Sequence, residues 1–176
     1  MKSLLALCLC LPIWATHFMI IPLQVNYNDE INQSIADGFF EIMNSAIHSV
    51  SEQNASYAVQ VVEELRPTWY HQSRIDDFYD KYDNNASFLN TIFEYTNIDI
   101  LLLSVIHKRT YDKNSSTTKI KSEIIFHHQD NTSTVQNTTL ATQLSYSTDI
   151  GSLIAEDLIT TQKQITKQLL QILETR

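Results

Sequence analysis

Two apolar segments separated by a polar turn constrain the fold of this chain more than any other feature. Residues 98–111 are rich in Ile, Leu and Val, which is typical of a mostly buried strand. The polar run 112–117 follows, and in 119–126 apolar and charged residues alternate as in a returning strand. The sequence therefore predicts a β-hairpin, and the same alternation predicts an edge strand at 21–25 and another strand at 57–65.

Helical spacing separates these strands. Apolar residues that recur at intervals of three and four predict a helix at 30–51, with Asn28 as its cap, and a second helix at 71–95. Two consecutive asparagines at 84–85 indicate a break in the second helix.

The segment after the hairpin has helical spacing as well. Apolar residues in 135–144 predict a short helix, which ends before Gly151. The apolar residues of 150–172 fit either one helical stripe or a short strand followed by a helix from about 161. We expect a single α+β domain in which amphipathic helices, including a C-terminal one, pack on one face of an antiparallel sheet.

The first 15 residues have the pattern of a secretory signal peptide. Lys2 precedes an apolar run, and the small residue Ala15 follows a proline. Cleavage after Ala15 leaves an extracellular domain of residues 16–176, with no segment inserted in a membrane. Because residues 18–21 are apolar too, an uncleaved anchor from residue 3 to about 23 is the alternative.

Asparagines in the pattern Asn-x-Ser/Thr also indicate export. Random placement of the Asn, Ser and Thr residues in this chain gives roughly two such sites, whereas the sequence has six. We predict N-glycosylation at Asn32, Asn54, Asn85, Asn114, Asn131 and Asn137.

Composition excludes several classes of protein. Cys8 and Cys10 both lie in the predicted leader, so a processed chain has no disulfide, no thiol nucleophile and no Cys-ligated zinc. The only glycines are Gly38 and Gly151, too few for a phosphate-binding loop, a dinucleotide fingerprint or a nucleophile elbow. The formal charge of −8 argues against nucleic acid and anionic membranes as partners.

No group of residues predicts a metal or cofactor site. Asp76, Asp77, Asp80 and Asp83 cluster on a helix opposite its apolar stripe, with three of the carboxylates on one face, and we interpret this as a solvated surface. His127 and His128 are adjacent on a strand and point to opposite faces, and the hairpin register places His107 nearer Ser122 than His127. We therefore predict no catalytic residue, metal or cofactor.

Residues 57–160 resemble the SEA domain, an extracellular ferredoxin-like module of heavily glycosylated surface proteins. The resemblance rests on the order of strands and helices, the hairpin and the glycosylation motifs. Self-cleaving members of that family carry Gly-Ser-Val-Val-Val between two strands, and the matching stretch here is Asn-Ser-Ser-Thr-Thr at 114–118. Ser115 stands in the place of the nucleophile, without the glycine and the valines.

These observations predict a secreted, N-glycosylated, non-enzymatic protein that binds another extracellular or cell-surface protein. Two alternatives remain at this stage. One is a membrane-tethered ectodomain held by an uncleaved leader, and the other is a self-cleaving or hydrolytic protein that uses Ser115 or His127.

Overall fold

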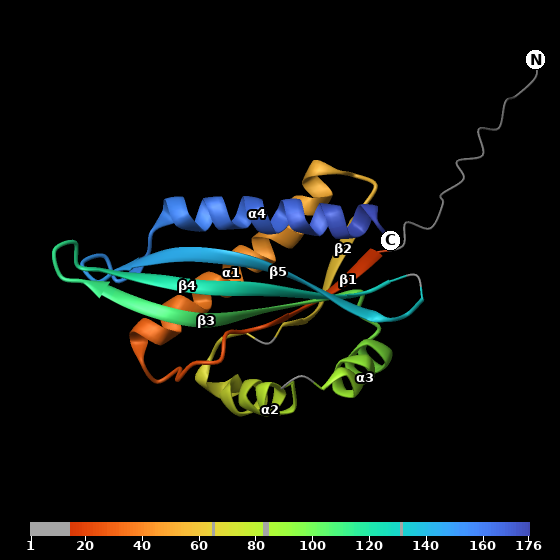
Figure 1. Cartoon of the computed structure of the whole chain (residues 1–176), viewed down its shortest axis with the longest axis horizontal. Coiled ribbons are helices and arrows are strands. Elements are labelled where there is room, and N and C mark those ends of the chain that lie inside the picture. The colour runs from red at the N-terminus through yellow and green to blue at the C-terminus, as the bar shows by residue number, and fades with distance from the viewer. Residues whose placement is uncertain (1–14, 65, 83–84, 131) are drawn as a thin grey trace, which may run out of the picture.

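The computed structural model of the chain describes residues 15–64, 66–82, 85–130 and 132–176. Figure 1 shows how the helices and strands of these ranges are arranged. In chain order they are β1 (Ala15–Ile21), α1 (Glu30–Gln53), β2 (Ala58–Glu64), the 3₁₀-helix η1 (Trp69–His71), α2 (Gln72–Tyr82), α3 (Ala86–Thr96), β3 (Ile100–Asp112), β4 (Thr117–Gln129), β5 (Val135–Ser147), β6 (Ser152–Leu153) and α4 (Ala155–Glu174). The predicted α+β class is confirmed.

The sheet is mixed, so the prediction of an antiparallel sheet is wrong in part. Its strands lie in the order β2-β1-β3-β4-β5-β6. β1 runs parallel to both β2 and β3, whereas the pairs β3–β4, β4–β5 and β5–β6 are antiparallel. The connections from β1 to β2 and from β2 to β3 pass through helices, and such crossovers join parallel strands.

β1 occupies the interior of the sheet, and the edge strand predicted at 21–25 is wrong. β1 ends at Ile21, just before Pro22, which has no N–H to donate to a ladder. Residues 18–21 are all at most 4% exposed, so β1 is buried on both faces. A continuous apolar run is the pattern of such a strand, although in the sequence it also resembles the end of an apolar leader.

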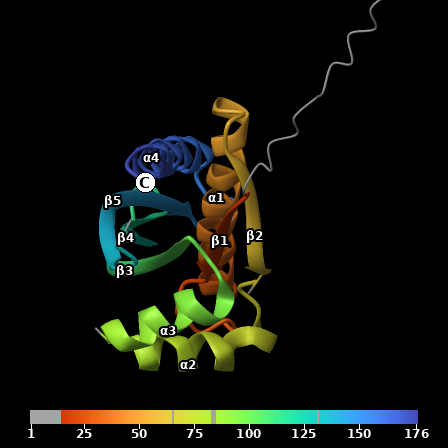
Figure 2. The ribbon, with the colours of Figure 1, turned by 90° about the vertical axis from the view of Figure 1, so that its right-hand side faces the viewer.

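Helices cover both faces of the sheet, which corrects the prediction that they pack on one face. In Figures 1 and 2, α4 lies on one side of the strands and α2 and α3 lie on the other. Phe18 and Leu102 pack with residues of α1 and α4 on the first side. Met19 and Leu101, their neighbours in sequence, pack with Phe78 of α2 on the second. Successive residues of β1 and β3 point to opposite faces of the sheet, and they are apolar on both. Each face is therefore buried against helices.

The first two predicted helices are confirmed, with one change of cap. α1 begins at Glu30, and the carboxylate of Asp29, rather than Asn28, accepts hydrogen bonds from the backbone N–H groups of Ile31 and Asn32 at 3.0 Å each. The predicted helix at 71–95 is interrupted as expected, since α2 ends at Tyr82 and α3 begins at Ala86.

The helix predicted at 135–144 is a strand. β5 pairs with β4 over its whole length, from Val135 opposite Gln129 to Ser147 opposite Thr117. Apolar residues at 140 and 144 fit a helix, but Thr142 between them is also buried, which completes a two-residue period. Gly151, with φ of 70°, then turns the chain into the short strand β6 and α4. A two-residue strand before a helix from Ala155 thus settles the ambiguity of the C-terminal segment.

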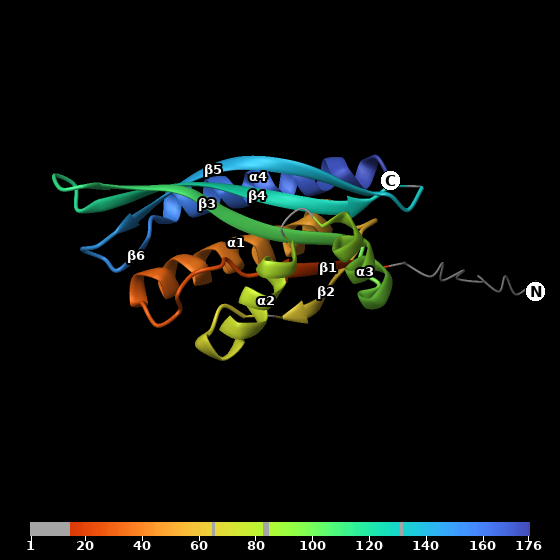
Figure 3. The same ribbon diagram turned by 60° about the horizontal axis from the view of Figure 1, so that its bottom comes forward.

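The predicted hairpin is confirmed, and each of its two strands has 13 residues. β3 and β4 pair from Ile100 opposite His128 to Asp112 opposite Thr117, with a bulge between Ile106 and Lys108. Figure 3 shows the tip of this hairpin projecting past the helices. β1 pairs with both β2 and β3, so the SEA-like segment 57–160 does not form this sheet without residues 15–21.

Candidate functional site

The described sequon asparagines lie at the surface or partly buried. Asn85, Asn114 and Asn137 are exposed, and Asn32 and Asn54 are half-buried. The side-chain oxygens of Asn32, Asn54 and Asn85 accept hydrogen bonds from Arg109, Ser56 and Phe88. N-linked glycans attach to the side-chain nitrogen, so these bonds are compatible with glycosylation. Asn131 lies outside the described residues.

The predicted cleavage site lies next to the first residue of β1. Ala15 is the first residue of β1 and pairs with Ala58 of β2. Cleavage after Ala15 therefore removes one residue from the end of β1, whereas an anchor through residue 23 would require the whole of β1 to leave the sheet. Among the described residues, no helix is long and apolar enough to cross a membrane. The leader residues 1–14 are not among the described residues.

The acidic face of α2 is solvated. Asp77 forms an ion pair with Lys81 at 2.6 Å, and Asp76 accepts a hydrogen bond from Gln24. Asp80 is exposed, and Asp83 is not among the described residues. Within the described residues, no three His, Cys, Asp or Glu side chains are grouped so that they could hold a metal ion.

Ser115 and His127 lie at opposite ends of β4. Ser115 is exposed in the turn before β4. Ten residues of strand separate Thr117 from His127, a length of roughly 33 Å. The two side chains therefore cannot exchange a proton. The predicted register is confirmed, since Ser122 pairs with Ile106, next to His107, while His127 pairs with Leu101.

His127 is a buried neutral side chain. It is 3% exposed, and its Nε2 is 2.9 Å from the hydroxyl of Tyr82. Burial, with a smaller contribution from His128, lowers the pKa of His127 to about 4, and burial raises the pKa of Tyr82. At neutral pH this hydrogen bond joins two uncharged groups, which makes neither an effective base. The pair lines a cavity of about 370 Å³ together with Asn137.

A larger cavity, of about 670 Å³, lies between the sheet and the first half of α4. We call it the hydroxyl groove, because it is lined by Ser122 of β4, Thr142 of β5 and Thr161 of α4. These residues are 3%, 7% and 2% exposed, and 2.8 Å separates the Ser122 and Thr142 hydroxyl oxygens. The groove thus brings buried polar groups from three elements to one place.

Charged side chains also line the hydroxyl groove, and they divide by element. His107 lines it from β3, whereas Glu156 and Asp157 come from the first turn of α4. His107 also approaches Glu123, with 3.3 Å between Nε2 and the nearer carboxylate oxygen. The two carboxylates lie where a helix dipole favours negative charge.

The sequence contains a signal for this groove that the predictions missed. Each of the three hydroxyl residues occupies a position of an otherwise apolar stripe: Ser122 between Ile120 and Ile124, Thr142 two residues before Leu144, and Thr161 one turn before Ile165. Three such interruptions, in three elements, predict a shared buried polar site.

The hairpin also carries a cluster of positive charge. Lys108 lies directly opposite Lys121 in the register of β3 and β4, and Lys119 is two residues from Lys121, so all three share one face of the sheet. We call these residues the lysine face. All three are exposed, and no ion pair within 4.0 Å that involves them is found among the described residues. Two carboxylates lie nearby: Asp112 interacts electrostatically with Lys119, and Glu123 is two residues from Lys121 on the same face. Like charges directly opposite each other destabilise a sheet.

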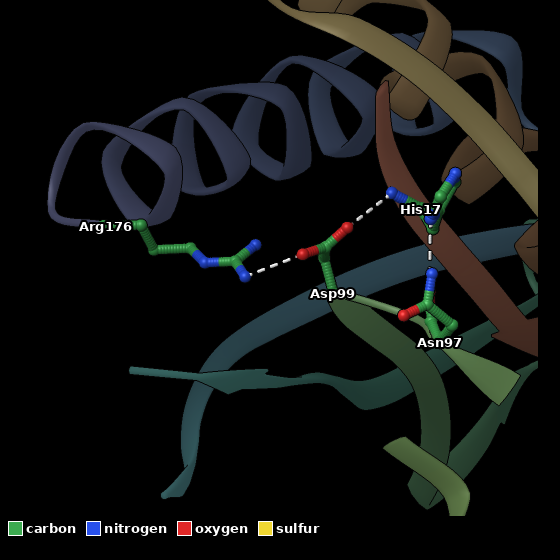
Figure 4. A network of polar contacts seen from close by, with 4 residues as sticks. All are labelled: His17, Asn97, Asp99 and Arg176. Carbon is green, nitrogen blue, oxygen red and sulfur yellow. Dashed lines mark hydrogen bonds and ion pairs between the residues drawn. The ribbon is translucent and has the colours of Figure 1, made fainter. Parts of the chain in front are cut away.

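A polar network joins three segments at the other end of the sheet (Figure 4). The backbone N–H of His17 in β1 and the side chain of Arg176 both donate to the carboxylate of Asp99, at 2.8 and 2.7 Å. The ring of His17 donates to the carbonyl of Asn97 at 3.1 Å. Asp99 thus ties the start of β1 and the end of α4 to the start of β3.

Comparisons with known proteins indicate no family. No protein-family model and no curated protein matches the sequence. Among solved structures, lipoprotein GNA1162 from Neisseria meningitidis is 12% identical with a TM-score of 0.42, and the match covers 89% of this chain and 99% of that one. The hypothetical protein CT253 from Chlamydia trachomatis is 12% identical with a TM-score of 0.44, over 76% of this chain and 74% of that one. Similarity this low gives no information on function.

Proposed function

We propose that this chain is a secreted, N-glycosylated protein without enzymatic activity, which binds another extracellular or cell-surface protein through the lysine face. The observation that carries the proposal is the register that sets Lys108 opposite Lys121, beside Lys119, in a chain of formal charge −8. An acidic surface on the partner relieves the repulsion among the three ammonium groups. Such a partner is favoured over a neutral one.

Secretion is supported by the position of β1. Ala15 is the first residue of β1 and pairs with Ala58, so cleavage after Ala15 removes one residue from the start of the strand and is compatible with the sheet. The predicted glycans on Asn114 and Asn137 lie in the turn before β4 and on β5, on either side of the lysine face along the sheet. The resemblance to SEA domains, which occur in glycosylated surface proteins, agrees with this placement.

We propose no enzymatic activity because neither of the two candidate catalytic residues, His127 and Ser115, is placed to act. His127 is buried, bonded to Tyr82 and too weak a base at neutral pH. Ser115 lies at the other end of β4 from it. Turnover of any substrate that one point substitution abolishes would contradict this part of the proposal.

The first experiment measures the intact mass of the protein from a secreting eukaryotic cell, before and after enzymatic removal of N-glycans. We expect one chain in the medium that begins at Thr16 and loses mass on deglycosylation. A cell-bound product that retains residues 1–15 would favour the tethered alternative. Two fragments that meet near Ser115, absent in Ser115→Ala, would favour self-cleavage.

The second experiment tests the lysine face with two variants of equal charge. Lys108→Gln/Lys119→Gln removes two charges from the lysine face, and Lys163→Gln/Lys167→Gln removes two from exposed positions of α4. Fluorescently labelled protein is incubated with intact cells of the source organism, with and without trypsin treatment of the cells. We expect binding that weakens with salt, disappears after trypsin and is lost only in the lysine-face variant.

Two results would overturn the proposed binding mode. Equal binding by both variants would remove the lysine face from the interaction. Binding that survives trypsin but is lost after removal of sulfated glycans would make the partner a polyanionic glycan rather than a protein.

A further inference from the structure

The sequon asparagine Asn137 lies against the cavity that His127 and Tyr82 line. In the register of β4 and β5, Asn137 is directly opposite His127, so the two side chains point to the same face of the sheet. That face is the one covered by α2 and α3, because His127 hydrogen-bonds Tyr82 at the end of α2. Asn137 is exposed and lines the cavity itself. A sugar attached to Asn137 therefore starts at the wall of this cavity, which we call the sequon cavity.

The sequon cavity has the composition of a site for a monosaccharide. Leu89 and Val135 supply apolar surface, and Tyr82 supplies an aromatic ring. Asn90 and Ser133 supply polar groups, and neither side chain forms a hydrogen bond with another described residue. A pyranose ring has C–H groups on its faces and hydroxyl groups around its rim, so it uses both kinds of surface. The volume, about 370 Å³, lies within the range of small-molecule sites.

The lining of the sequon cavity favours a neutral ligand. Among the described residues, no Asp, Glu, Lys or Arg lines it, although Glu123 acts electrostatically on Tyr82 from outside the lining. His127 is uncharged at neutral pH, because burial lowers its pKa to about 4. A charged ligand would lose hydration here without gaining an ion pair. N-acetylglucosamine, the first sugar of an N-linked glycan, is neutral and has an amide and hydroxyl groups that can bond to Asn90.

The sequon at Asn114 provides a contrast within the same chain. Asn114 is exposed in the turn between β3 and β4, at the hairpin tip that projects past the helices (Figure 3). A glycan on this residue is expected to extend into solvent. The two sites therefore differ in whether the protein offers a surface to the first sugar.

We propose that the N-linked glycan on Asn137 folds back onto the protein, with its first N-acetylglucosamine seated in the sequon cavity. The sugar ring packs against Tyr82, Leu89 and Val135, and its amide and hydroxyl groups bond to Asn90 and Ser133. The inference rests on the proposed glycosylation and adds to it a fixed place for this one glycan.

The test compares the release of two glycans from the same native glycoprotein. A peptide-N-glycosidase cleaves the bond between asparagine and the first sugar and converts the asparagine to aspartate, which peptide mass spectrometry detects at each site. A seated sugar shields this bond, so we expect release from Asn137 to be roughly tenfold slower than from Asn114, or slower still. After denaturation the two sites should be released alike.

Two variants of α3 show whether the sequon cavity causes the protection. Asn90 lines the cavity and is exposed, so Asn90→Trp should fill the space of the sugar without disturbing the core. Release from Asn137 is then expected to reach the rate at Asn114. The matched control, Ser87→Trp, makes the same substitution at another exposed position of α3 that is not part of the lining, and it should leave Asn137 protected.

The possible failures are distinguishable from one another. Equal release from Asn137 and Asn114 in the native protein would overturn the seating of the sugar, while the proposed glycosylation would stand. Protection that survives Asn90→Trp would place its cause outside the cavity. A product with glycans elsewhere but none on Asn137 would overturn this inference alone, whereas a product without any glycan would overturn the proposed function as well.

Discussion

The buried histidine of β4 predicts how the stability of the protein depends on pH. His127 is 3% exposed and its pKa is lowered from 6.5 to about 4, chiefly by burial. The unfolded chain binds a proton at this side chain below pH 6.5, whereas the folded chain does so only near pH 4. Between these values the unfolded state binds more protons, so the folded state is destabilised as the pH falls.

The size of the effect follows from the difference in pKa. Above pH 6.5 His127 is neutral in both states and has no effect. Each pH unit below 6.5 costs about 1.4 kcal/mol of unfolding free energy, which gives about 2 kcal/mol at pH 5 and about 3 kcal/mol in all by pH 4. Burial lowers the pKa of His128 too, so this neighbour adds an effect of the same sign.

The variant His127→Gln separates the two histidines. Glutamine does not titrate and can still form a hydrogen bond with Tyr82, while His128 and Glu123 remain in place. Urea unfolding at pH 7, 6 and 5 should show that the wild type loses about 2 kcal/mol more than the variant between pH 7 and pH 5. If both proteins lose the same amount, His127 titrates alike in the folded and unfolded states, and the reasoning from its burial is wrong.

Four other substitutions test the structure by urea unfolding. Asp29→Ala should cost about 1 kcal/mol because it removes the cap of α1, whereas Asn28→Ala, at the position favoured by the sequence, should change little. Asp99→Asn should cost about 1 kcal/mol, and less at high salt, because its ion pair is partly exposed. Leu169→Ala in α4 should cost about 3 kcal/mol because the side chain is fully buried, while an unchanged stability would show that α4 is not part of the core.

The sequence predicts those elements in which one periodicity dominates. α1, β2 and the β3–β4 hairpin follow from spacing alone, and the interruption between α2 and α3 follows from two asparagines. β5 was predicted wrongly because residues four apart lie on one face of a helix and also on one face of a strand. Only the burial of Thr142, which is a tertiary property, distinguishes the two.

The position of β1 could not be read from local pattern. Residues 18–21 are apolar on both faces because they lie between β2 and β3, and that neighbourhood depends on two crossover connections. A leader and a buried strand have the same composition over so short a length. The mixed sheet and the helices on its second face follow from this strand, which explains why these predictions failed together.

The lysine face is exposed because the strands of the hairpin are longer than the helices that cover the sheet. Strands of 13 residues such as β3 and β4 extend roughly 43 Å, whereas α2 and α3, with 11 residues each, extend roughly 16 Å. Helices of that length leave the tip of the hairpin uncovered, and charge on an uncovered sheet also prevents pairing with other chains. Preventing such pairing does not require charges of one sign, because a mixture of positive and negative side chains would prevent it without the repulsion between Lys108 and Lys121. If Lys108→Gln/Lys119→Gln stays monomeric and gains stability while it loses binding, the lysine face is kept for a partner. Aggregation of that variant with unchanged binding by its monomer would show that the lysines serve solubility instead.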